Sequence, residues 1–288
     1  MDKLSPPPNR QKAVTPKFLR HLHQMGSATQ SPCAIDHAVD LLIGGFFFAV
    51  RPCEIVLTKT PGKTKTLCLG DIVFRASNRR VIPKSHPHLL SLIQFISLTW
   101  RDQKNGLRMD TRTQRITNDP ILCPSRLAKA VQRILSFVPD ANDDTLLCTC
   151  RPPCAVKPSF VTDDFTLQLL RNACTTFGGK DTFGFTASEI GNRSIRSGAA
   201  MALFLKDHSV HKIMILGRWS SDAFLVYIRP QVLEWTNNMS RDMISFDSFL
   251  DIGLWDIAST TDPKQRRRTN LMNGRNTYLQ MPAFNIHG

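Results

Sequence analysis

Two segments near the end of the chain decide the expected fold. Residues 191–200 read G-N-R-S-I-R-S-G-A-A, and residues 216–230 read L-G-R-W-S-S-D-A-F-L-V-Y-I-R-P. In the first segment, Asn192 can cap the helix that follows. Arg193 and Arg196 would share a face of its first turn, beside free backbone N–H groups. This arrangement favours phosphate binding, and the alternative is a solvated basic turn.

The second segment contains one of the two tyrosines of the chain. Gly217 is expected to end a helix, and a new helix can begin at the serines that follow. Tyr227 comes ten residues after Gly217, and the other tyrosine is Tyr278. Tyr227 stands among apolar residues, so a buried core tyrosine is the alternative to a reactive phenol.

A third segment, A-V-R-P-C-E-I at residues 49–55, contains the expected end of an apolar, buried helix and the charged residues Arg51 and Glu54. Pro52 disfavours helical geometry at Arg51, so the helix before it should break there. The guanidinium of Arg51 would then be held at a rigid corner, with Glu54 positioned to brace nearby structure. The alternative is a surface arginine with a carboxylate near it.

Around these segments the hydrophobic periodicity predicts a mainly helical α+β protein, a helical bundle with a small three-stranded antiparallel sheet. Helices are expected over Pro16 to about Met25, Ala34 to Arg51, Pro124 to Val138, Thr162 to about Phe177, Asn192 to about Leu205, 209–216, 221–236 and 240–250. Strands are expected over Thr66 to Phe74, Leu92 to Trp100 and Leu107 to Ile116, the last two joined by a turn over 101–106.

The charge of the chain favours a polyanionic partner. Lys and Arg number 37 against 23 Asp and Glu, which gives a net charge of +14. Nucleic acid fits this excess because each neutralised phosphate releases counterions, whereas an anionic membrane surface or mere solubility would also fit. The longest apolar run, residues 41–50, is about half of the roughly 20 residues that a membrane-spanning helix needs. We therefore expect no membrane partner.

The cysteines suggest an intracellular, reduced protein. The eight cysteines follow a Pro-rich, polar N-terminus without the apolar core of a secretory signal. Cys148, Cys150 and Cys154 form C-T-C-R-P-P-C, but C-x-C-x₃-C lacks the paired spacing of structural zinc sites. Free thiols in a strand and loop are favoured, and neither a metal nor a cofactor is expected.

The order and spacing of these motifs resemble the tyrosine recombinase (phage integrase) family. An early R-x-x-E, a lysine in a strand-to-strand turn, a late arginine-bearing helix and a tyrosine nine residues after the Arg of G-R-W follow that pattern. I-R-S-G-A-A followed by L-G-R-W-S-S-D-A-F-L-V-Y-I-R is similar to recombinases of eukaryotic mobile elements of the DIRS-like or Crypton-like kind. The resemblance covers about residues 16–250 and implies a catalytic core like that of DNA breaking-rejoining enzymes, between a flexible basic lead-in (1–15) and a basic tail (251–288).

The resemblance implies a role for each motif residue. Arg51 corresponds to the first catalytic arginine and Arg196 to the second. Lys104 corresponds to the lysine that protonates the leaving oxygen, and Tyr227 to the nucleophile. By the family pattern, the tyrosine forms a 3′-phosphotyrosyl link to double-stranded DNA without ATP, metal or cofactor.

Two family positions are occupied in an unusual way. The His-or-Trp position falls on Arg218 by strict spacing, whereas Trp219 is its chemical equivalent, and both stay candidates. The family's histidine three residues before the second arginine is Arg193 here, which can donate hydrogen bonds but cannot act as a base. A helical core-binding domain usually precedes the catalytic part and is not recognisable in the lead-in.

Two functional hypotheses follow. The first is a site-specific DNA recombinase or integrase that associates with itself on DNA and acts in the nucleus. The second is a catalytically degenerate or domesticated DNA-binding remnant of a mobile element. The run K-Q-R-R-R at 264–268 fits a nuclear address or a solvated basic tail.

Overall fold

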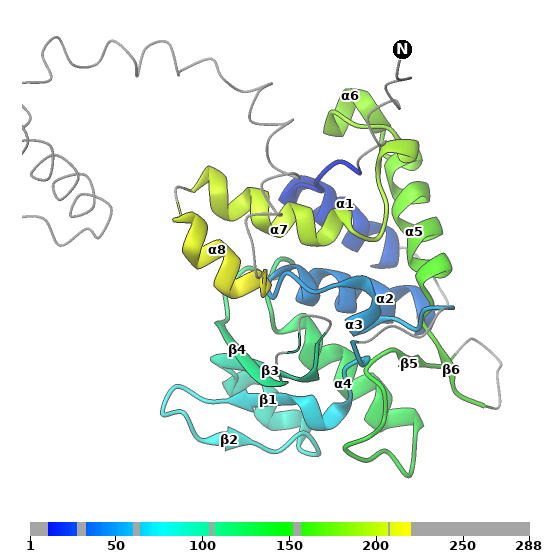
Figure 1. Cartoon of the computed structure of the whole chain (residues 1–288). Helices are drawn as coiled ribbons and strands as arrows, with labels where there is room; N and C mark the ends of the chain where they lie inside the picture. The colour runs from blue at the N-terminus through cyan, green and yellow to red at the C-terminus, as the bar shows by residue number, and fades with distance from the viewer. Residues whose placement is uncertain are drawn as a thin grey trace, which may run out of the picture. The chain divides into compact units, whose positions relative to one another are not determined.

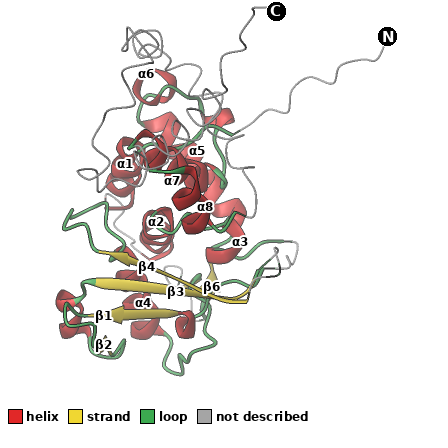
Figure 2. Cartoon of the chain, turned by 60° about the vertical axis from the view of Figure 1, so that its left-hand side comes forward, coloured by secondary structure: helices red, strands yellow, loops and turns green. Residues whose placement is uncertain are grey.

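Helix α2 (Cys33–Phe46) packs against other helices on two sides. Helices α1 (Pro16–Ser27) and α7 (Ser194–Leu205) contact it from one side, and α4 (Arg126–Phe137) contacts it from the side of the sheet (Figure 1, Figure 2). A helix contacted on both sides needs apolar residues on most of its surface. The buried helix predicted from the apolar run is therefore confirmed.

The structure is a computed structural model that describes residues 11–27, 33–59, 64–103, 106, 108–151, 157–206 and 208–219 of the 288. These residues belong to one compact unit, Met1–Pro230, and a second unit comprises Gln231–Gly288. The remaining described helices are α3 (Pro52–Ile55), α5 (Asp163–Thr176), α6 (Gly179–Phe183) and α8 (Val210–Gly217), with 3₁₀ turns at Leu69–Asp71, Pro87–Leu92 and Ala187–Glu189. The helices expected at 221–236 and 240–250, and the tail over 251–288, lie outside the described residues.

Several helices begin and end where the sequence signals place them. The helices predicted from Pro16, from Pro124 and at 209–216 are confirmed as α1, α4 and α8. Thr162 caps α5, because its hydroxyl accepts a hydrogen bond from the backbone N–H of Phe165 at 3.2 Å. Gly178 stops the helix with a φ of +92°, a conformation that favours glycine.

Helix α7 begins differently from the prediction. Arg193 occupies its N-cap position without a side-chain cap, so the expectation that Asn192 caps this helix is wrong. The side-chain amide of Asn192 instead donates to the carbonyl of Asp163 at 2.7 Å and accepts from the hydroxyl of Thr166 at 2.9 Å. Asn192 therefore ties the start of α7 to the start of α5.

Helix α2 ends at Phe46, five residues before the predicted break at Arg51. The backbone N–H of Val50 donates to the carbonyl of Gly45 at 3.2 Å, and Ala49 lies between them with a φ of +46°. This is a Schellman ending, which usually places glycine at the left-handed position. Alanine gives no sequence signal for it, so the end of α2 was predicted too late.

The sheet has four antiparallel strands in the order β2-β1-β3-β4, one more than predicted. Strands β3 (Phe95–Asp102) and β4 (Arg108–Arg115) form the predicted hairpin.

Strand β1 (Ile72–Arg75) begins six residues later than expected, because the carboxylate of Asp71 accepts from the backbone N–H of Cys68 at 2.8 Å and fixes a 3₁₀ turn before it. The unpredicted strand is β2 (Val81–Ile82), and β5 (Thr149–Cys150) and β6 (Ser159–Phe160) pair separately. The described part of the chain is thus a mixed α+β fold.

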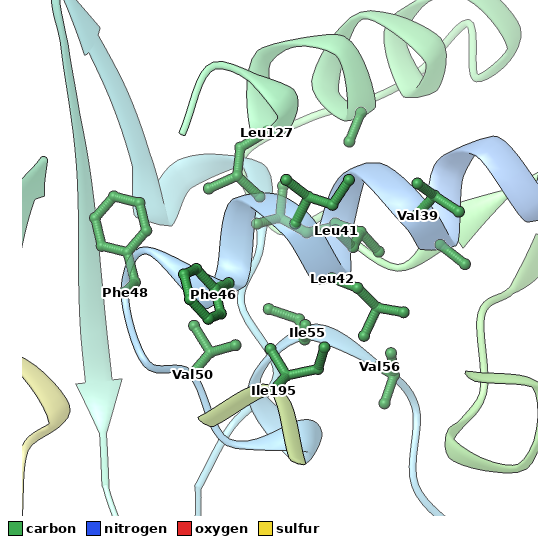
Figure 3. Close-up of a cluster of buried hydrophobic side chains, with 14 of the residues drawn as sticks. Val39, Leu41, Leu42, Phe46, Phe48, Val50, Ile55, Val56, Leu127 and Ile195 are labelled. Atoms are coloured by element: carbon green, nitrogen blue, oxygen red, sulfur yellow. The ribbon is translucent and has the colours of Figure 1, made fainter. Parts of the chain in front are cut away.

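The core is formed by α2 and the elements around it. In Figure 3, Leu127 of α4 faces one side of α2, while Ile55, Val56 and Ile195 lie on the other side. Close approach of α4 depends on Gly44, where a Cβ atom would lie 2.5 Å from Cγ of Leu127. No helix among the described residues is long and apolar enough to cross a membrane.

Residues 11–15 pack against the start of α7, so the flexible lead-in expected over 1–15 does not extend to them. The backbone N–H of Lys12 donates to the carbonyl of Glu189 at 2.7 Å, and that of Val14 donates to the carbonyl of Ser194 at 3.2 Å. Val14 is buried, and a Cβ atom at Gly198 would lie 3.0 Å from its Cγ2. Residues 11–15 are therefore part of the folded unit.

Candidate phosphate-binding site

The C-terminal ends of α2 and α8 meet at one place in the fold. Helix α8 ends as α2 does, with the N–H of Trp219 donating to the carbonyl of Met214 at 3.0 Å and Arg218 at a φ of +57°. Gly217 ends α8, as predicted. Because a helix C-terminus carries unsatisfied carbonyls and a partial negative charge, two such ends side by side favour cations between them.

Arg196 joins the two helix ends. Its Nη1 donates to the carbonyl of Ala49 after α2, and its Nη2 donates to the carbonyl of Gly217 at the end of α8. Its guanidinium carbon lies 4.0 Å from the centre of the Trp219 ring, within the range of a cation–π contact. Arg196 is 8% exposed, so this guanidinium is largely buried.

Arg51 stands at the N-cap of α3 and is braced by Glu54. The backbone N–H of Arg51 donates to Oε2 of Glu54 at 2.7 Å, and its Nη1 donates to Oε1 at 3.0 Å. Two longer bonds, each 3.4 Å, join Nη1 to Oε1 of Gln103 and Nη2 to the carbonyl of Arg218. The side chain of Arg51 is 21% exposed, whereas that of Glu54 is 0% exposed. Arg51 is therefore the more accessible partner of a half-buried ion pair.

Arg218 lies inside the protein. Its Nη2 donates to Oε2 of Glu54 at 2.7 Å, and its Nη1 donates to the carbonyl of Phe48 at 3.1 Å. Its guanidinium carbon stacks 3.6 Å from the centre of the Trp100 ring. Burial lowers the pKa of Arg218 to about 10, which leaves it protonated near neutral pH.

The structure brings together some of the residues that the sequence singled out and not others. Arg51 contacts the carbonyl of Arg218, while Arg196 contacts the carbonyl of Gly217 and the ring of Trp219, so these residues gather around the end of α8. Lys104 and Tyr227 lie outside the described residues.

Arg193 stands apart from this cluster. It is exposed at the start of α7, and its side chain has no partner within the part of the chain that the structure describes. Its backbone N–H donates to Oε1 of Gln11 at 3.2 Å. The expectation of two guanidiniums paired at the N-terminus of α7 is therefore wrong, because Arg196 reaches the C-termini of α2 and α8 instead.

Sequence reasoning missed several residues of the cluster. Arg112 on β4 donates from Nε to the carbonyl of Ile215 at 2.9 Å and pairs with Asp110. Arg112 and Asp110 are two residues apart on a strand, so they share a face, and this was the available signal. No comparable signal pointed to Gln103 or Trp100.

The cysteines that suggested a zinc site are buried thiols in the described residues. Cys148 and Cys150 are buried thiols, burial raises the pKa of Cys148 to about 12, and Cys154 lies outside the described residues. Within the described ranges, no group of three His, Cys, Asp or Glu side chains could hold a metal ion.

Comparison with known proteins gives no independent assignment. No protein-family model matches the chain, and a search of curated proteins finds no similar sequence.

The cluster is suited to hold an anion. Its side chains include four guanidiniums (Arg51, Arg112, Arg196, Arg218) and two carboxylates (Glu54, Asp110), which leaves two positive charges in excess. Guanidinium forks match the geometry of phosphate oxygens. Nη2 of Arg51 is held by one long bond only, so it is a weakly engaged donor of the cluster.

Proposed function

We propose that the chain is the catalytic domain of a tyrosine recombinase, which cuts and rejoins double-stranded DNA through a 3′-phosphotyrosine at Tyr227. One observation carries the proposal: Arg51 and Arg196, far apart in the sequence, donate to the carbonyls of two consecutive residues, Arg218 and Gly217. Two guanidiniums on neighbouring carbonyls are close enough to approach the same phosphate. The DNA breaking-rejoining type of core and self-association on DNA belong to this proposal, and so does a nuclear location.

The positions of Lys104 and Tyr227 in the sequence agree with this site. Tyr227 is eight residues beyond Trp219, a separation of about 12 Å along a helix and at most about 28 Å along an extended chain. Lys104 directly follows Gln103, whose side chain accepts a hydrogen bond from Arg51 at 3.4 Å. These sequence separations are compatible with the proposed roles of Lys104 and Tyr227.

The geometry favours Trp219 over Arg218 for the His-or-Trp position of the family. The side chain of Arg218 is 0% exposed and its hydrogen bonds are directed into the protein. Trp219 is half-buried, and its ring lies against Arg196. An indole N–H can donate to a phosphate oxygen but cannot take up a proton.

The proposed chemistry assigns one task to each group. The phenol of Tyr227 loses its proton to solvent and its oxygen attacks the phosphorus, the bond to the 5′ oxygen breaks, and Lys104 supplies the proton to that oxygen. Arg51 and Arg196 stabilise the charge on the non-bridging oxygens in the transition state, and loss of one such donor commonly raises the barrier by about 3–4 kcal/mol. Guanidiniums close to the phenol favour its phenolate form, because a tyrosine titrates near 10 in water.

A DNA-binding remnant is the second candidate, and Arg193 is the observation that favours it. Arg193 replaces the family's histidine and lies exposed at the start of α7. A guanidinium stays protonated near neutral pH and cannot serve as a base. If that histidine acts as a base in the family, this chain binds DNA through the same cluster without cutting it.

A covalent-adduct assay distinguishes the two candidates. The purified protein is incubated with nicked duplexes of randomised sequence, which trap a protein–DNA adduct after cleavage because the short fragment that carries the released 5′ hydroxyl diffuses away. A recombinase forms an adduct that resists denaturing gel electrophoresis, Tyr227→Phe abolishes it, and Tyr278→Phe, the matched control, retains it. An adduct that survives Tyr227→Phe contradicts the assignment. Absence of an adduct both in the wild type and in Arg193→His, with binding retained, supports the remnant.

A further inference from the structure

The carboxylate of Glu54 is shared by two arginines. Oε1 accepts from Nη1 of Arg51 at 3.0 Å, while Oε2 accepts from Nη2 of Arg218 at 2.7 Å and from the backbone N–H of Arg51 at 2.7 Å. The proposed chemistry gives Arg218 no task. Yet a fully buried guanidinium is costly to place in a protein and requires a partner.

Because Glu54 binds both arginines, only some N–H groups of Arg51 can bind its carboxylate. A planar guanidinium pairs most strongly with a carboxylate when two parallel N–H groups bind both oxygens. Arg51 does not reach that geometry, because Oε2 is already occupied. Its Nη2 makes only a 3.4 Å bond to the carbonyl of Arg218. One edge of Arg51 is therefore weakly held.

We propose that Arg218 is a positioning residue, whose buried guanidinium occupies the second oxygen of Glu54 and thereby keeps one edge of Arg51 available to a phosphate. The inference rests on the proposed function, since the phosphate is that of DNA. Arg218 itself does not touch the DNA. Its side chain is 0% exposed and lies between Glu54, the carbonyl of Phe48 and the ring of Trp100.

The charges support the same role. Arg51 and Glu54 alone would form a neutral pair, which attracts a phosphate weakly. With Arg218 the three side chains carry one net positive charge. Because the positive charge of Arg218 neutralises Glu54 from the interior, the charge of Arg51 is left for the anion on the accessible side.

The backbone of Arg218 serves the same arrangement. At a φ of +57° it adopts a conformation that glycine adopts more easily. This turn directs its side chain into the protein while its carbonyl faces Nη2 of Arg51. Its Nε is buried without a partner among the described residues, so the side chain is oriented for the contacts of its Nη atoms.

The first test asks which arginines touch an anion. Inorganic phosphate is titrated into the full chain, and the side-chain Nε–H signals of the arginines are followed by NMR, with assignments from single substitutions. We expect the Arg51 signal to shift on titration and the Arg218 signal to stay unchanged and to exchange slowly with solvent. A shift of the Arg218 signal as large as that of Arg51 would overturn the proposal.

The second test uses the coupling between Arg218 and Glu54. Arg218→Gln should weaken the phosphate affinity reported by Arg51 by about tenfold or more, because Arg51 then pairs with both oxygens of Glu54. Adding Glu54→Gln should bring that affinity back to within about threefold of the wild type, since no carboxylate remains to hold Arg51. A double variant no better than Arg218→Gln would refute the proposal. Arg171→Gln, at an exposed position on α5, is the control and should change nothing.

Two further measurements keep the outcome decisive. If Arg218→Gln fails to fold by near-UV circular dichroism, Arg218→Lys takes its place. Because the Arg218→Lys variant keeps a positive charge beside Glu54, its phosphate affinity should lie within about threefold of the wild-type affinity. A larger loss of affinity counts against the proposal. If wild-type protein forms no covalent DNA adduct, the recombinase proposal fails, while the phosphate titration still decides the role of Arg218.

Discussion

Gly217→Ala offers a direct test of how the end of α8 holds Trp219. A Cβ atom at residue 217 would lie 2.5 Å from Cη2 of the Trp219 ring and closer still to two other ring atoms. Since carbon atoms prefer a separation of about 3.5–4.0 Å, the ring must move by more than about 1 Å. That movement separates it from the guanidinium of Arg196, now 4.0 Å from the ring centre.

The expected cost has two parts. Overpacking typically costs about 1–3 kcal/mol, and loss of a partly desolvated cation–π contact adds about 0.5–2 kcal/mol. We expect the free energy of unfolding to fall by about 1.5–5 kcal/mol, the sum of the two parts. The rate of adduct formation should fall by about 100-fold, the usual effect of a misplacement of about 1 Å in an active site.

Urea denaturation of a double-mutant cycle with Trp219→Ala measures the effect. In the Trp219→Ala background the new methyl group meets no ring, so Gly217→Ala should change stability by less than about 0.5 kcal/mol. Equal destabilisation in both backgrounds would refute the reasoning, as would a wild-type-like Gly217→Ala protein.

Two further predictions concern stability. His37 is buried, its Nε2 contacts the carbonyl of Leu147 at 2.7 Å, and burial lowers its pKa from 6.5 to about 4. Between pH 4 and pH 6.5 the unfolded chain binds more protons at this residue than the folded protein does, so the free energy of unfolding should fall by about 2 kcal/mol from pH 7 to pH 5. In urea titrations, His37→Gln should remove that part of the pH dependence. An unchanged dependence of the free energy of unfolding on pH would contradict this prediction. Gly198→Ala would place a Cβ atom 3.0 Å from Cγ2 of Val14 and closer to its carbonyl oxygen. Gly198→Ala should lower the free energy of unfolding by about 1–3 kcal/mol in the full chain and by little in a chain without residues 1–15. An equal loss of stability in the two chains would count against the docking of residues 11–15.

The elements that the sequence predicted well are those with local signals. Helix α5 begins at a capping threonine and stops at Gly178, and both signals are contained within a few residues. The hairpin of β3 and β4 was predicted from an Asn-Gly turn between two strand-forming segments. The end of α2 and strand β2 (Val81–Ile82) were not, because an alanine at positive φ and a two-residue strand have no distinctive sequence pattern.

The candidate site shows the same division. Motif order pointed to Arg51 and Arg196, which the structure brings to neighbouring carbonyls. The ion pair of Glu54 and Arg218 joins residues that are 164 positions apart, and the periodicity of the sequence does not predict such a long-range contact. Spacing alone therefore left Arg218 and Trp219 as equal candidates for one position, and only their burial separates them.

The central claim is that Arg51, Arg196 and Tyr227 surround a single DNA phosphodiester. A crystal structure of the Tyr227→Phe protein bound to an uncut duplex measures this directly. The account predicts that both guanidiniums donate to non-bridging oxygens of one phosphate, with ring carbon Cζ of residue 227 facing that phosphorus. Guanidiniums on different phosphates, or a ring at residue 227 buried away from the DNA, would contradict it.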